Sequence, residues 1–326
     1  MKTIFVVNPK AGQGKGLDKL YAAIESARTQ YELDVDVYTT TAVGDATRFV
    51  ADYCKTNPPA RFIACGGDGT ANEVLNGMID VPECEMGVLP IGTGNDFCRN
   101  FPDCGNFKDV LAQIGGKTQR CDAIRIDTEG QTFYCMNMVN IGFDSNVAAM
   151  TVEMKKKPFV SGPLAYFVSI FGTLIPKKGT DLKIESEGEV IHDGPLLLTS
   201  IANGRFCGGG IQSNPGASVC DGLLNINMIY DISRLNFLRL LPSYMKGTHM
   251  QIRGIERFIS NFAKQSVTVT PNTPTALLSL DGEIAPHKKL TFTAVHEAFS
   301  MVVPAKDLGG ILDEQTCIRE NVCAGQ

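Results

Sequence analysis

The sequence lacks any close pairing of cysteines. Its eleven cysteines stand singly along the 326 residues, and no Cys-x-x-Cys pair occurs. This spacing, together with the odd count, fits neither a zinc site nor a disulfide framework. The four histidines show no metal-binding spacing either. We expect buried, reduced thiols in a reducing compartment.

A long hydrophobic run is also missing. The N-terminus has one short apolar run, residues 4–7, and Asn8-Pro9 ends it, which predicts a strand rather than a signal peptide. No stretch is long and apolar enough to span a bilayer. On these grounds we expect the protein to be cytoplasmic.

The sequence also has no excess of basic over acidic residues. The 30 lysines and arginines are outnumbered by 35 aspartates and glutamates, which gives a net charge of −5. Proteins that bind nucleic acid usually carry a basic surface, so we expect no nucleic-acid partner. The apolar fraction of 44% is that of an ordinary globular protein, and 326 residues suffice for two domains.

Glycine, in contrast, is abundant. The chain has 33 glycines in 326 residues, or about 10%, against a usual ~7%. They gather in clusters, and a residue without a Cβ lets the backbone come close to another group. The clusters therefore predict loops that approach a ligand.

Two different patterns of secondary structure divide the chain. Strands are predicted at residues 4–7, 33–39, 61–65 and 85–89, alternating with helices at 17–27, 44–53 and 70–78. This alternation favours a parallel sheet with helices on its faces. Later strands follow one another, at 131–139, 181–191, 195–202, 223–229, 266–270, 275–280 and 289–295, with helical stretches only near 159–175 and 234–247. That pattern favours a mainly β, sandwich-like domain.

We therefore predict three parts. An α/β domain with a parallel sheet occupies residues 1–122, and a mainly β, sandwich-like domain occupies residues 123–295. A C-terminal segment, residues 296–326, partly returns to the first domain.

The strongest motif is Gly66-Gly67-Asp68-Gly69-Thr70, which lies between a buried strand and a helix. A strand–loop–helix of this kind directs backbone N–H groups and a helix N-terminus toward an anion. Asp68 supplies a carboxylate for a metal or a proton, and Thr70 can both cap the helix and bind phosphate. An ordinary tight turn would explain any single Gly-Gly pair, but the five residues together indicate phosphate binding.

Two further glycine segments follow predicted strands. One covers residues 8–16 and the other residues 90–97. The first is not a Walker A loop, because Pro9 stands where that motif needs a glycine, and it also misses the Rossmann spacing. Ligands of open α/β sheets bind at the carboxyl ends of the strands, so the three loops should converge on one nucleotide-sized crevice.

These motifs, in this order, resemble the diacylglycerol kinase catalytic domain. The resemblance rests on Asn8-Pro9-x-x-Gly12, Gly66-Gly67-Asp68-Gly69-Thr70-x-Asn72-Glu73-x-x-Asn76-Gly77, Pro90-x-Gly92-Thr93-x-Asn95-Asp96-Phe97, Asn140-Ile141-Gly142-Phe143-Asp144, Asn203-Gly204-x-x-x-Gly208-Gly209-Gly210, Pro215-x-Ala217-x-x-x-Asp221-Gly222-Leu223-Leu224 and Asp281-Gly282-Glu283. It covers residues 1 to about 304. The chain looks most similar to the bacterial soluble lipid kinases.

The resemblance implies an ATP-dependent kinase that phosphorylates a lipid hydroxyl, most simply that of diacylglycerol. ATP would be bound in the first domain, and the second would take the lipid. The nucleotide-binding residues would be Asn8, Pro9, Lys10, Ala11, Gly12, Thr40, Gly66, Gly67, Asp68, Gly69, Thr70, Asn72, Glu73 and Thr93. Thr40 is carried over from its place four residues before Gly44-Asp45-Ala46. The resemblance also suggests a homodimer.

The resemblance further implies catalytic and metal-binding residues. Glu283 would take the proton from the lipid hydroxyl, and Asp68 would help to hold the phosphates of Mg·ATP. A structural Mg²⁺ would lie near Ser218, Asp221 and Leu223. The chain departs from the family here, since Cys220 and Asn225 stand where acidic residues are usual. Mg²⁺ prefers oxygen ligands, so these changes weaken the expected site.

From the residues alone, Asp281-Gly282 is a hairpin-turn dipeptide and Glu283 could merely begin a strand. Asp96, Arg99 and Asp122 could form a charge network near the phosphates, or ordinary surface ion pairs.

Contact with a membrane is expected of a lipid kinase. Residues 159–175 are mostly apolar and are flanked by lysines, and residues 234–250 carry arginines and a lysine among leucines. Either segment could lie on an anionic membrane surface or pack on the second domain. We therefore expect the protein to associate peripherally with a membrane. Two alternatives to a lipid kinase remain: a small-molecule kinase similar to the NAD kinases, and a non-enzymatic, membrane-associated regulatory protein.

Overall fold

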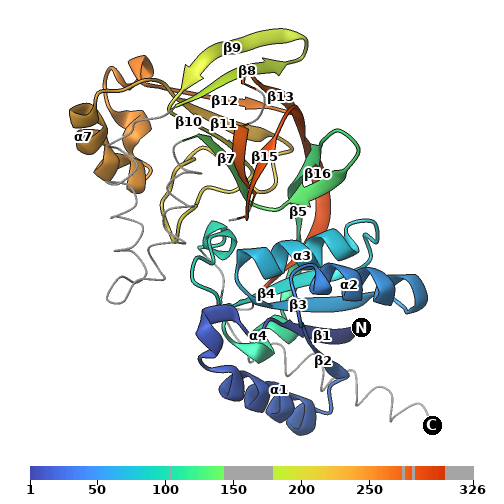
Figure 1. Cartoon of the computed structure of the whole chain (residues 1–326). Helices are drawn as coiled ribbons and strands as arrows, with labels where there is room; N and C mark the ends of the chain where they lie inside the picture. The colour runs from blue at the N-terminus through green and yellow to red at the C-terminus, as the bar shows by residue number, and fades with distance from the viewer. Residues whose placement is uncertain (103–104, 143–178, 274–275, 281–282, 305–326) are drawn as a thin grey trace. The chain divides into compact units, whose positions relative to one another are not determined.

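The computed structural model describes residues 1–102, 105–142, 179–273, 276–280 and 283–304 (Figure 1). The chain divides into two compact units, which are considered separately. Unit 1 comprises Met1–Gly92, Phe101–Arg120 and Phe299–Gln326, and unit 2 comprises Thr93–Asn100 and Cys121–Ala298. The predicted helix at 159–175 lies outside the described residues.

Unit 1 is an α/β layer built on a parallel sheet. Its elements are β1 (Lys2–Val7), the 3-10 turn η1 (Ala11–Gly14), α1 (Leu17–Tyr31), β2 (Val35–Thr39), α2 (Asp45–Thr56), β3 (Ala60–Gly66), α3 (Asp68–Met78), β4 (Glu85–Pro90) and α4 (Val110–Ile114). The strands lie in the order β2-β1-β3-β4, and all three pairings are parallel. The end of a later strand adds to β4, where Ser300 pairs with Glu85.

Burial explains why these strands pair in this way. Nearly every side chain of β1, β3 and β4 is buried, as expected of central strands covered on both faces. α1 packs against α4, and α2 packs against α3. Leu20, Ile24 and Ala27 recur at helical spacing on α1 and join the apolar core of the sheet. The predicted parallel α/β half of the fold is confirmed.

Unit 2 is mainly β. Its elements are η2 (Phe97–Asn100), β5 (Lys117–Asp127), β6 (Thr132–Cys135), β7 (Met138–Gly142), β8 (Thr180–Ser186), β9 (Glu189–Leu196), β10 (Leu198–Ala202), β11 (Leu224–Ile229), α7 (Arg234–Met245), η3 (His249–Gln251), η4 (Ile255–Arg257), β12 (Ile259–Lys264), β13 (Ser266–Pro271), β14 (Ala276–Leu280), β15 (Glu283–His287) and β16 (Leu290–Val303). Both β5 and β16 begin in one unit and end in the other.

Two layers of antiparallel strands enclose the core of unit 2. One sheet has the order β12-β11-β10-β7-β14-β15. In the other layer, β13 lies between β8 and the first part of β16, β9 pairs with β8, and β5 pairs with β6. One apolar cluster includes side chains of both layers, among them Ile226 from the first and Phe292 from the second. The predicted sandwich-like second half is confirmed.

Two predicted strands are wrong in detail. The segment 181–191 is a hairpin, because Glu187 and Gly188 both have positive φ (53° and 82°) and turn the chain between β8 and β9. Two-residue hairpin turns need this geometry, but Glu-Gly is a weaker signal for it than Asn-Gly. The segment 131–139 contains β6 and β7, which pair with different strands. Among the described helices, none is both long and apolar enough to cross a membrane.

Candidate active site

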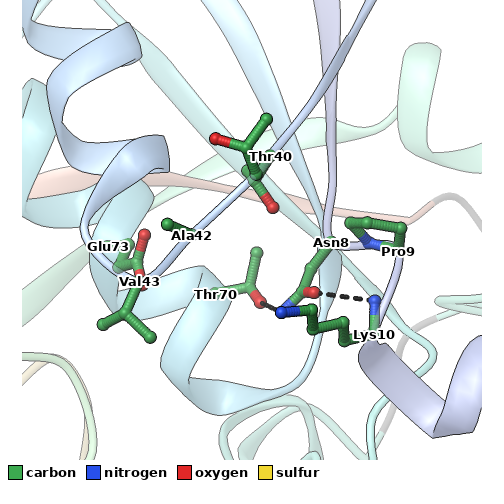
Figure 2. A pocket seen from close by; sticks show the side chains of 9 residues that line it. Asn8, Pro9, Lys10, Thr40, Ala42, Val43, Thr70 and Glu73 are labelled. Carbon is green, nitrogen blue, oxygen red and sulfur yellow. Dashed lines mark hydrogen bonds between the residues drawn. The ribbon is translucent and has the colours of Figure 1, made fainter.

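A small cavity lies in unit 1 where the chain leaves β1 and β2 and enters α3. Its volume is about 110 Å³. Its lining comprises Asn8, Pro9, Lys10, Thr40, Thr41, Ala42, Val43, Thr70 and Glu73 (Figure 2). The neighbouring strands β1 and β3 lead to helices on opposite faces of the sheet, α1 and α3, so the cavity lies at the topological switch point between these two strands (Figure 1). Open α/β sheets bind their ligands at such points.

Asn8 joins two of the loops. Its side-chain amide donates to the Thr70 hydroxyl at 3.0 Å, and its side-chain oxygen accepts the N–H of Lys10 at 3.0 Å (Figure 2). Its own N–H donates to the carbonyl of Cys65, at the end of β3. The loop after β1 is thereby fixed to the first turn of α3.

Glycines allow the loops to come this close. Gly12 has φ +57°, and a Cβ at this position would lie 2.5 Å from the carbonyl oxygen of Ile91. A Cβ on Gly66 would lie 2.3 Å from the Thr70 hydroxyl oxygen. The Gly66 carbonyl accepts the N–H groups of Ile91 and Gly92, each at 3.0 Å. The parts of the three glycine segments that belong to unit 1 are thus brought together as predicted.

The N-terminus of α3 faces this region. The helix starts at Asp68, and its N-cap is Gly67 in an extended conformation, without a side-chain capping bond. The predicted cap at Thr70 is therefore wrong. Thr70 lies within the first turn, where its buried hydroxyl accepts the bond from Asn8 instead. Asp68 is the acidic residue of that first turn.

The loop after β2 also belongs to the site, and Thr40 is its one residue that was predicted from the sequence. Thr40 is held by its N–H, which donates to the carbonyl of Val7 at 2.8 Å. Asp45 accepts the N–H and the hydroxyl of Thr41, at 2.8 and 2.9 Å. The carboxylate of Asp45 is buried, and these bonds hold its pKa below the usual value. The Gly44-Asp45 pair, from which Thr40 was located, was the sequence feature that could have identified this loop.

Glu73 lines the cavity and also anchors α2. Its carboxylate accepts the N–H of Ala46 at 3.2 Å, and its carbonyl accepts the Thr47 hydroxyl at 2.9 Å. Asn72 precedes it on α3, and Ala11 and Gly12 lie in η1. The remaining predicted residues (Thr93, Ser218, Asp221, Leu223 and Glu283) belong to unit 2.

Acidic residues in unit 2 hold its loops. Asp96 accepts the N–H of Gly209 at 2.9 Å and pairs with Arg99 at 3.4 Å. Asp122, which is 1% exposed, accepts the N–H groups of Gly222 and Glu297 and pairs with His296 at 2.8 Å. The proposed charge network therefore divides into an Asp96–Arg99 pair and a separate Asp122 cluster.

In the loop predicted to bind magnesium, Asp221 and Leu223 are exposed and Ser218 is half-buried. Asp221 accepts the N–H of Leu223 at 3.1 Å, and Ser218 accepts the N–H of Cys220 at 3.4 Å. No cluster of three or more His, Cys, Asp or Glu side chains suited to a metal ion occurs in the described part of the chain. Glu283 is the first residue of β15 and pairs with Leu280 of β14.

Comparison with known proteins agrees with these features. Residues 2–126 match the diacylglycerol kinase catalytic domain, and residues 137–303 match the YegS C-terminal NAD kinase beta sandwich-like domain. The second match alone spans half of the chain.

Several relatives match over nearly their whole length. A diacylglycerol kinase of Mycobacterium tuberculosis is 28% identical over 311 residues, which cover 93% of this chain and 95% of the relative. The diacylglycerol kinase of Bacillus subtilis is 26% identical over 303 residues, covering 92% and 95%. A crystal structure of a diacylglycerol kinase from Bacillus anthracis has a TM-score of 0.65 at 19% identity, covering 93% of this chain and 96% of that one, and so shares the fold. The chain therefore belongs to the diacylglycerol kinase and YegS-like family of lipid kinases.

Proposed function

We propose that the protein transfers the γ-phosphate of ATP to the hydroxyl group of a lipid, with diacylglycerol as the substrate. Residues 1–122 would bind the nucleotide and residues 123–295 the lipid. The observation that supports this proposal is the cavity at the strand ends of unit 1, which Asn8, Lys10 and Thr70 line beside the N-terminus of α3. Two relatives that match nearly end to end are named diacylglycerol kinase, which supports the choice of lipid.

The residues around the cavity suit a triphosphate. The ammonium group of Lys10, the second N–H of the Asn8 amide and the hydroxyl of Thr70 are hydrogen-bond donors, whereas the Thr40 hydroxyl already donates to the Val7 carbonyl at 3.3 Å. The first N–H groups of α3 add the positive end of a helix dipole. Gly67 and Gly69 keep side chains away from this helix end, and nothing lies within 4 Å of a Cβ built on Gly69. Phosphate oxygens could therefore approach the backbone.

The proton of the lipid hydroxyl needs an acceptor. We assign this role to Glu283 and the handling of the phosphates to Asp68. Phosphoryl transfer depends chiefly on position and on stabilising charge, and a general base contributes typically 10²–10⁴-fold. Bound Mg²⁺ would neutralise negative charge on the phosphates.

A structural Mg²⁺ would be held by the Asp221 carboxylate and the main-chain oxygens of Ser218 and Leu223. These oxygen donors suit a hard cation, whereas the thiol of the exposed Cys220 does not. With Asp221 as its single carboxylate, we expect this site to bind Mg²⁺ weakly.

The test is turnover by the purified protein with Mg·ATP, in mixed micelles of diacylglycerol and, in parallel, with NAD. We expect turnover with diacylglycerol only, reduced at least a hundredfold in Glu283→Ala. Glu189→Ala is the matched control, because Glu189 also begins a strand, β9, but lies outside the site. Turnover with NAD alone would overturn the choice of substrate. Equal turnover of the two variants would remove Glu283 as the base.

A further inference from the structure

One face of helix α7 packs on the sandwich of unit 2. The helix starts after Ser233, whose hydroxyl caps it by accepting the N–H of Asn236 at 3.3 Å. Its inward side chains, Phe237, Leu240, Leu241, Tyr244 and Met245, join an apolar cluster with Leu197, Leu198, Ile229, Ile232, Ile255 and Ile259. This face accounts for the stability of the helix, as is usual for an amphipathic helix.

The opposite face of α7 carries a second row of side chains. Leu235, Leu238, Arg239, Pro242 and Lys246 are spaced by three or four residues, so they form one stripe along the helix, here called the α7 stripe. All five residues are exposed, with Leu235 at 58% and Leu238 at 37%. Single exposed leucines are common on protein surfaces, but two in one row with two cations need an explanation.

This part of the chain is basic, whereas the chain as a whole is acidic. From Arg234 to Arg253 the sequence contains four arginines and lysines and no aspartate or glutamate, although the whole chain has a net charge of −5. Neither Arg239 nor Lys246 forms an ion pair with a described residue. Met250, which is 39% exposed, follows the helix and adds a further apolar group.

We propose that the α7 stripe docks on the surface of a membrane that contains anionic phospholipids. Leucines at the boundary between headgroups and acyl chains, with cations beside them, are the chemistry by which a helix lies on such a surface. Each basic residue near an anionic leaflet adds attraction that salt screens. The inference rests on the proposed function in one respect, since docking would bring unit 2 to the bilayer that holds a lipid substrate.

Binding can be measured without turnover. The full chain is sedimented with vesicles of phosphatidylcholine alone, or with a third of phosphatidylglycerol, without ATP or diacylglycerol. We expect binding to the anionic vesicles, weakened by salt. Both Leu235→Gln/Leu238→Gln and Arg239→Gln/Lys246→Gln should reduce the affinity at least tenfold.

Matched controls separate the α7 stripe from general surface effects. Val190→Gln removes an exposed apolar side chain of β9, and Lys108→Gln/Lys117→Gln removes two exposed cations of unit 1. We expect both controls to bind within twofold of the parent protein. Equal losses in controls and stripe variants, or no binding by the parent protein, would overturn the proposal.

The absence of tryptophan provides a second readout. Because the chain has no tryptophan, Leu238→Trp introduces a single reporter of its own surroundings. Its emission should shift to shorter wavelength with anionic vesicles, whereas that of Val190→Trp should not. A shift that instead follows protein concentration without vesicles would assign the stripe to a contact between two copies and refute the membrane assignment.

Activity assays distinguish a failure of docking from a failure of the proposed function. The stripe variants should lose turnover of long-chain diacylglycerol in vesicles but keep turnover of a dispersed short-chain diacylglycerol. If the parent protein binds vesicles through the stripe yet phosphorylates neither lipid, the docking surface stands and the proposed substrate fails. If the stripe variants lose both activities, the α7 stripe does not act as a docking surface alone, and the proposed role is contradicted.

Discussion

Gly66→Ala tests how tightly the loops of the candidate site are packed. An added Cβ would meet three side-chain atoms of Thr70, at 2.3 Å from Oγ1, 2.5 Å from Cβ and 2.9 Å from Cγ2. Ordinary van der Waals contact begins near 3.4 Å. Thr70 must therefore move, although its hydroxyl is bonded to Asn8.

The cost follows from these contacts. Overpacking a well-packed site costs typically 1–3 kcal/mol, and losing the Asn8–Thr70 hydrogen bond adds about 1 kcal/mol. We expect Gly66→Ala to lower the free energy of unfolding by about 2–4 kcal/mol, measured by urea denaturation followed by circular dichroism. The control is Gly69→Ala in the same turn, where nothing lies within 4 Å of the new Cβ and the change should be within about 1 kcal/mol of neutral.

A second substitution identifies the cause. Thr70→Ala in the Gly66→Ala background removes the contacts with Oγ1 and Cγ2 but keeps the one with Cβ, so it should restore stability only in part. Thr70→Gly removes all three contacts and should restore more, apart from the cost of glycine in a helix, about 1 kcal/mol. Residues in contact couple, so additive effects of the single changes would refute the reasoning.

Three further predictions concern pH, nucleotide binding and thiol reactivity. His249 is fully buried, and burial lowers its pKa to about 4. The free energy of unfolding should therefore fall as the pH drops from about 6.5 toward 4, by about 3 kcal/mol in all. His249→Phe should remove this pH dependence, measured by urea unfolding at a series of pH values. Asp45→Asn weakens the acceptor for Thr41 and should raise KM for ATP several-fold while leaving KM for the lipid unchanged; an unchanged KM for ATP would contradict the assigned role of this loop. Burial raises the pKa of Cys54 to about 12, so iodoacetamide at pH 8 should modify the exposed Cys220 before Cys54 in peptide mapping, and faster labelling of Cys54 would be the contrary result.

Local patterns were sufficient for much of the fold. Central strands such as β3 consist of consecutive buried residues that end in glycines, and α1 repeats its apolar residues at helical spacing. Such signals depend on neighbours in the sequence, so they could be recognised without a structure. The hairpin at Glu187-Gly188 was missed because its strands continue the same alternation through a turn of unusual composition.

The order of the motifs determined the family, and the glycine loops predicted the position of the cavity. Local patterns did not predict which other side chains line the cavity. Thr41 and Val43 line the cavity because Asp45 fixes their loop. Likewise, Asp122 contacts His296, which lies 174 residues away in the sequence. The α7 stripe became recognisable only when packing showed which face of the helix is buried. Contacts between distant segments follow from the packing of the whole chain, whereas the sequence alone determines periodicity, turn chemistry and the strand–loop–helix that forms an anion site.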